Sequence, residues 1–207
     1  YRWLFKHLPY DPQRDFTPLL PTFRTHFFIV VGKDSPHQHL SELLAAARQP
    51  GAVTYGSWAV GSPAHLGGAM LAAQTRTDMR HIVYKETAQL YTDVANGTLS
   101  FALGTLATTR SLLDGGRLRL LAVAAPKRLP THPNVPTVAQ AGGPANFEMA
   151  GINLMVAPPG LPAQRADQLW RDVGQALQGP DVDAKFTAFG YEHFSLPRAA
   201  MPRYLAE

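Results

Sequence analysis

The chain has no cysteine, little charge and no long hydrophobic run, and each absence narrows its class. Without cysteine there can be no disulfide, thiol catalysis, iron–sulfur cluster or cysteine-ligated zinc site. Charged residues make up 16% of the 207 residues, too few for a coiled coil or a basic nucleic-acid-binding arm. The longest apolar stretch, residues 120–125, is far shorter than the roughly 20 residues that span a bilayer. No signal peptide is recognisable.

What remains is the composition of a folded protein. Hydrophobic residues make up 45% of the chain, enough for a substantial core. The net charge of +4 comes from basic residues scattered along the sequence, which does not indicate a nucleic-acid partner. The 18 Pro and 17 Gly predict many turns between short elements.

Strand-like and helix-like segments alternate through most of the chain, which predicts βαβ units on a mostly parallel sheet. Residues 1–21 read as an irregular connector, and residues 147–157 as a strand that crosses between lobes. Strands are expected at 27–31, 53–55, 81–84, 99–103, 118–124 and 191–194, and helices at 40–48, 63–74, 87–95, 106–114, 163–177, 181–189 and from 197.

The most informative segment is residues 57–62, which we call the serine loop. It joins a predicted strand to a predicted helix and contains Ser57, Gly61 and Ser62. Ser62 is expected to cap the helix and Pro63 fits its first position, so the first-turn N–H groups would favour a carboxylate or phosphate. The alternative is an ordinary capped helix that binds nothing.

Two more turns follow predicted strands and precede helices, at residues 84–87 and 103–105. If the strands are parallel, these turns face the same edge as the serine loop, where open α/β sheets bind ligands. Thr87 and Thr105 would cap their helices, and Lys85 would supply a cation for an acid. Ordinary capping and a surface lysine are the alternatives.

Other chemistry has weaker support. The loop lacks the Lys-Ser/Thr pair of a phosphate-binding P-loop, and no G-x-S-x-G hydrolase motif occurs. Ser62 and His65 would form a catalytic pair only if a distant carboxylate oriented the histidine. His37 and His39 are a weak metal signal, for which surface histidines are the simpler interpretation. We therefore expect no catalytic residue, metal or cofactor.

Several blocks of sequence resemble one known family. Residues 8–16 read LPYDPQRDF, and further similar blocks follow in the family's order over nearly the whole chain, at residues 54–57, 61–62, 65–66, 83–85, 116–123, 135–138 and 157–160. Together they resemble the Bug receptors, or TctC family, which are the solute-binding proteins of tripartite tricarboxylate transporters.

The resemblance implies a type II periplasmic binding protein fold, with two α/β lobes joined by crossing strands. Residues 33–146 would form the lobe with the serine loop. Residues 1–32 and 147–207 would form a second lobe, incomplete because the family's first strand and helix should precede Tyr1.

The implied function is that of a periplasmic receptor for a small organic acid: a di- or tricarboxylate, an acidic amino acid or an aromatic acid. It would deliver this ligand to a membrane permease. A degenerate receptor that acts as a sensor or interaction module is the alternative, and a Ser–His hydrolase is a weaker one.

The resemblance also implies where the ligand binds. Ser57, Gly61 and Ser62 match the family's glycine–serine loop, Tyr84 and Lys85 its second segment, and Gly104 and Thr105 a third, more variable one. Trp58, His65 and Thr87 complete the predicted set. The sequence leaves open which acid binds and the oligomeric state.

Overall fold

The protein folds as two compact units in a computed structural model that describes residues 7, 9–11 and 14–206. The central unit is His26–Gly151, and the split unit combines the chain up to Thr25 with the segment from Ile152. The division predicted at residues 33 and 146 needs correction, because the strand β2 (Phe28–Gly32) pairs with strands of the central unit.

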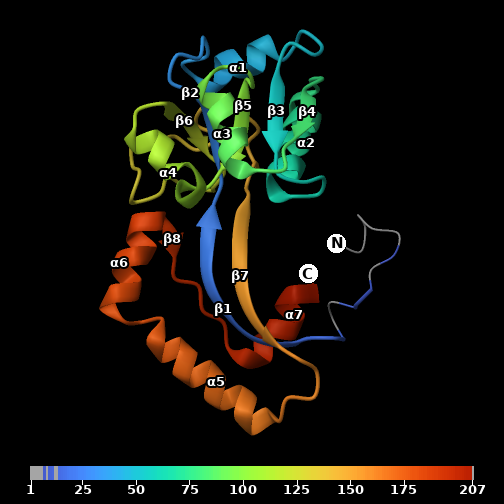
Figure 1. Ribbon diagram of the computed structural model, residues 1–207, viewed down its shortest axis with the longest axis vertical. Helices are drawn as coiled ribbons and strands as arrows, with labels where there is room; N and C mark the ends of the chain where they lie inside the picture. The colour runs from blue at the N-terminus through green and yellow to red at the C-terminus, as the bar shows by residue number, and fades with distance from the viewer. Residues whose placement is uncertain (1–6, 8, 12–13, 207) are drawn as a thin grey trace. The chain divides into compact units, whose positions relative to one another are not determined.

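The central unit alternates strands and helices, close to the predicted boundaries (Figure 1). After β2 come α1 (Leu40–Ala46), β3 (Thr54–Ser57), α2 (Pro63–Thr75), β4 (Arg80–Val83), α3 (Thr87–Ala95), β5 (Phe101–Gly104), α4 (Leu106–Asp114) and β6 (Leu118–Val123).

Five strands form the sheet of this unit in the order β4-β3-β5-β2-β6. β3 is parallel to β4 and β5, whereas β2 is antiparallel to β5 and β6. Four strands therefore share one direction, as the prediction of a mostly parallel sheet requires. β2 is the exception, and the chain enters it from β1 of the other sheet and not from a helix of the central unit.

Helices cover both faces of the central sheet. Alternate residues of a strand point to opposite faces, and in β2 Ile29 and Val31 pack with Leu43 of α1 and Leu71 of α2. Phe28 and Val30 face the other way, where the core cluster includes Leu90 and Val94 of α3 and Leu106 of α4. The result is a three-layer α/β/α arrangement.

The split unit has a smaller sheet with the order β7-β1-β8. Its elements are β1 (Thr17–His26), β7 (Ala150–Ala157), α5 (Ala163–Ala176), α6 (Pro180–Phe189), β8 (Tyr191–Glu192), a 3-10 turn (Arg198–Ala200) and α7 (Met201–Ala206). β1 and β7 extend one or two residues into the central unit, so the predicted crossing strand is present.

The predicted irregular connector over residues 1–21 was wrong from Thr17 onward, where β1 begins. The strand was not predicted because Pro18 and Pro21 are typical of loops. A proline lacks the N–H that a strand donates to its neighbour, and β8 pairs with β1 only at Arg24 and Thr25, beyond both prolines. Residues 1–6, 8 and 12–13 of that connector lie outside the described residues.

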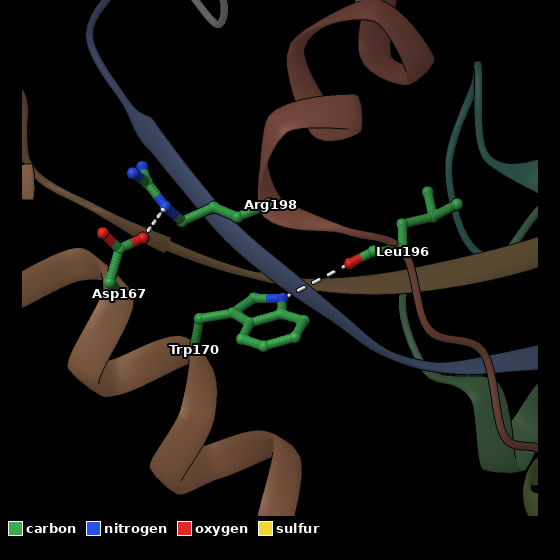
Figure 2. A network of polar contacts seen from close by, with 4 residues as sticks. All are labelled: Asp167, Trp170, Leu196 and Arg198. Carbon is green, nitrogen blue, oxygen red and sulfur yellow. Dashed lines mark hydrogen bonds and ion pairs between the residues drawn. The ribbon is translucent and has the colours of Figure 1, made fainter.

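Helix α5 is held to the last segment of the chain by two polar contacts (Figure 2). The indole N–H of Trp170 donates to the Leu196 carbonyl at 3.3 Å, and Arg198 Nε donates to Asp167 Oδ1 at 2.6 Å. Beside them, Ala166 packs on Leu20 of β1 in the apolar cluster of this unit. In the described part of the chain, no helix has the length and hydropathy of a membrane span.

Candidate ligand-binding site

The three predicted turns lie at one edge of the central sheet. Because β3, β4 and β5 are parallel and in register, with Ser57 opposite Val83 and Gly56 opposite Ala102, their carboxyl ends meet there. Each strand end leads into a helix, α2, α3 and α4 in turn (Figure 1). The structure thus brings together the segments that sequence reasoning had selected, at the edge where open α/β sheets bind ligands.

Ser57, at the end of β3, is fully buried and uses its hydroxyl within the protein. Its Oγ lies 3.0 Å from the Ala59 carbonyl and 2.7 Å from Nε2 of His81 on β4. This pairing makes Ser57 a support of the loop. Ala59 and Val60, at the tip of the loop, are exposed.

Ser62 caps α2 as predicted. Its Oγ accepts the backbone N–H of His65 at 3.3 Å, and Pro63 takes the first helical position. Just before it, Gly61 adopts a φ of +80°, a conformation that glycine reaches without strain, and donates its N–H to Nδ1 of His65 at 3.0 Å. The N–H groups of Gly61 and His65 are therefore engaged by the chain itself.

His65 and His81 bring two imidazole rings together beneath the serine loop. Their centroids are 4.2 Å apart, and the Tyr55 ring of β3 lies 4.9 Å from that of His81. Burial, and then the nearby His65, lower the pKa of His81 below its usual value. Sequence reasoning missed His81, although its position in an edge strand next to the serine-loop strand was available as a signal.

Tyr84, in the second turn, points its hydroxyl toward α3. The hydroxyl donates to Asp93 Oδ2 at 2.8 Å, and burial followed by this bond raises the pKa of Tyr84 to about 12. Lys85 is exposed at the same turn. The prediction that Thr87 caps α3 was wrong. Glu86 holds the extended cap position without a side-chain bond, and Thr87 is the first helical residue.

The third turn is built for close packing. A Cβ on Gly104 would lie 2.6 Å from Cγ2 of Thr109 and 2.9 Å from the Tyr91 hydroxyl, so only glycine fits. Thr105 caps α4 as predicted, with its Oγ1 accepting the Thr108 N–H at 3.3 Å. Trp58, from the first turn, is half-buried and packs against the core clusters on both faces of the sheet.

The alternative chemistries gain no support from these contacts. Ser62 meets His65 through the backbone N–H, and no carboxylate among the described residues hydrogen-bonds the His65 ring. His37 and His39 lie at the start of α1, where Glu42 Oε2 accepts the His39 N–H at 3.1 Å. Within the same described ranges, no three His, Asp or Glu side chains form a group that could hold a metal ion.

The fold of this chain is similar to that of solved periplasmic solute-binding proteins. The solved periplasmic binding protein BugD matches with a TM-score of 0.85 and 24% identity, over 98% of this chain and 69% of that one. Rpa4515 of R. palustris, solved with adipate, matches with a TM-score of 0.90 and 29% identity, over 98% of this chain and 68% of that one.

The family follows from the sequence as a whole. The model of the tripartite tricarboxylate transporter family receptor, TctC, matches residues 2–207, and the chain belongs to this family. A UPF0065 protein from the tcbD-tcbE intergenic region of Pseudomonas sp. strain P51 is 30% identical over 182 residues, which are 87% of this chain. The chain spans only 54% of that relative's length. The resemblance seen in the sequence is confirmed, and a receptor family agrees with the prediction that the chain is not an enzyme.

Proposed function

We propose that the chain is the ligand-recognising part of a periplasmic receptor that binds a small carboxylate and presents it to the permease of a tripartite transporter. The observation that carries the proposal is the convergence of three strand–helix turns at one edge of the central sheet. The similarity to Rpa4515, solved with the dicarboxylate adipate, supports an acid as the ligand.

The electrostatics of this edge support an anion. The 13-residue helix α2 directs its amino end toward the serine loop, and a helix amino end carries partial positive charge. Lys85 adds an exposed cation at the neighbouring turn, while Glu86 beside it opposes an anion. We infer that Lys85 attracts the ligand carboxylate and that the serine loop and Thr105 position it.

Ligand binding can be tested by the thermal stability of the whole chain against adipate, malate, succinate, citrate, glutamate and nicotinate. A ligand present at 100 times its Kd adds about 2.7 kcal/mol to the unfolding free energy. For a chain of this size, the gain raises Tm by roughly 5–11 °C. We expect a selective rise with one or more dicarboxylates. A cooperative melt that no acid shifts would contradict the proposal and favour a degenerate sensor or interaction module.

A matched pair of lysines tests the position of the site. Lys85→Met removes the cation at the proposed edge, and Lys33→Met removes another exposed cation after β2, which runs the opposite way and ends at the other edge. We expect Lys85→Met to raise Kd by about tenfold, which corresponds to ~1.4 kcal/mol. Lys33→Met should leave Kd unchanged, and equal effects of the two would refute this position.

A further inference from the structure

We propose that the acid bound at this edge has a hydrocarbon body without hydroxyl groups, and that Val60 and Val83 contact that body while Lys85 attracts a carboxylate. This inference rests on the proposed function and deepens it, because it names which carboxylates the same site selects. An unsubstituted methylene chain or an aromatic ring meets the requirement. Hydroxylated acids such as malate, tartrate and citrate do not.

The most exposed apolar side chains belong to the segments around this edge. Val60, Val83 and Leu66 are 64%, 51% and 47% exposed, more than any other large hydrophobic side chain in the described part of the chain. Val60 lies in the serine loop, Val83 is the last residue of β4, and Leu66 stands at the start of α2. A single exposed valine is ordinary on a protein surface, but three such side chains around one candidate site indicate a surface that contacts something apolar.

The charge beside these side chains indicates what that apolar partner carries. Lys85 is exposed and follows Val83 by two residues, which places the two Cα atoms within roughly 7 Å of each other. A ligand that lies against Val83 therefore brings its head group within reach of the lysine ammonium. An acid with an apolar body fits this combination, because its carboxylate pairs with the cation while its hydrocarbon part leaves water.

The sheet register places Val83 next to the serine loop. Val83 is opposite Ser57 in the parallel pair of β4 and β3, and the Tyr84 N–H donates to the Ser57 carbonyl at 2.8 Å. Alternate residues of a strand share a face, so Val83 lies on the same face of β4 as His81. That face meets the start of α2, because the rings of His81 and His65 are 4.2 Å apart. Val83 is two residues closer to the edge than this contact, where the serine loop leads into α2.

The hydroxyl groups of the three turns are largely used by the chain. Ser57 and Ser62 are buried, and the hydroxyl of each already has a hydrogen bond within the protein. The Tyr84 hydroxyl donates to a carboxylate of α3, and Thr105 caps α4. A ligand hydroxyl at this edge thus loses water and gains few partners, whereas a methylene group gains from contact with the two valines.

The first test compares acids that share a carbon skeleton and differ in their hydroxyl groups. Calorimetry of the whole chain gives Kd for succinate, malate and tartrate, which have four carbons, and for adipate and its tetrahydroxy form galactarate. We expect one hydroxyl to weaken binding by about fivefold or more, since it is desolvated without a new partner. We expect adipate to bind more tightly than succinate, by about fourfold for each added methylene that becomes buried.

The second test changes the apolar surface itself. Val60→Thr and Val83→Thr each replace a methyl group by a hydroxyl of similar size, at side chains too exposed to support the core. Each should weaken the binding of succinate and adipate by about three- to tenfold and leave the Tm of the ligand-free chain unchanged. Thr98→Val is the matched control. It makes the reverse exchange at an exposed residue before β5, at the opposite edge of the sheet, and should leave both Kd values unchanged.

The outcomes separate this inference from the proposed function. If malate or tartrate binds as tightly as succinate, or if both valine variants keep the native affinity for succinate and adipate, carboxylate binding stands and the inference is overturned. If no acid of either series binds, the proposed function fails and the inference fails with it. Weaker binding in the valine variants, with native affinity in Thr98→Val, supports both.

Discussion

Tyr84 joins the turn after β4 to helix α3 through one hydrogen bond, from its hydroxyl to Asp93 Oδ2. Tyr84→Phe removes this bond and leaves the ring, so we expect the unfolding free energy to fall by about 1–2 kcal/mol in urea denaturation. The raised pKa of Tyr84 means that the bond contributes fully below pH 10 and is lost as the pH rises through about 12.

Tyr10→Phe serves as the control for this prediction. Tyr10 is 41% exposed and stacks edge-on against Phe16, so removal of its hydroxyl should change stability by less than about 0.5 kcal/mol. Equal losses in the two variants would show that the Tyr84–Asp93 bond adds nothing to the fold.

At the scale of single residues, the sequence predicted where polar side chains lie along the chain. It did not predict which groups they contact. Ser62 and Thr105 were predictable as caps because capping depends on local position alone. The pairing of Ser57 with His81 joins residues 24 apart, and it exists only because β3 and β4 are neighbours in register. Tyr84 was selected as a ligand contact, yet its hydroxyl turns to α3, a direction that no sequence pattern encodes.

Two glycines inside helices should respond in opposite directions to the same substitution. Gly174 lies within α5, and a Cβ there would meet nothing within 4 Å, so Gly174→Ala should raise stability by about 1 kcal/mol and Tm by roughly 2–4 °C. Gly68 lies within α2, where a Cβ would fall 2.1 Å from the Tyr55 ring. Gly68→Ala should therefore destabilise the protein by about 1–3 kcal/mol.

Calorimetric melts of the two alanine variants check this pair. Since both changes give the same gain in helix propensity, the difference in Tm isolates the packing against Tyr55. A rise in Tm for Gly68→Ala would mean that α2 can move away from β3 at little cost, and that the close packing there is not required.

Helices and strands were predictable where a local sequence pattern marks them. The spacing of apolar residues located α1, capping and terminating residues located α2 through α4, and the order of strands and helices placed the three turns at one edge. The direction of β2 was not predictable, because it is set by pairing with β5 and β6, which come much later in the chain. β1 was not predicted, because Pro18 and Pro21 are typical of a loop.

The two units have hydrophobic cores of very different size. In the described part of the chain, the central sheet lies between clusters of eighteen and twelve buried residues, whereas the cluster of the split unit has four. Since hydrophobic stabilisation grows with the apolar area buried, the split unit has far less of it.

We therefore expect the split unit to open at a lower free energy than the central unit, and hydrogen exchange followed by mass spectrometry to resolve the difference. Peptides from β2 and β5, whose residues are buried on both faces, should exchange slowest. Peptides from α5 and β7 should exchange at least tenfold faster, because a difference of about 1.4 kcal/mol in opening free energy already gives that ratio. Equal protection of α5 and β5 would show instead that the two units unfold as one.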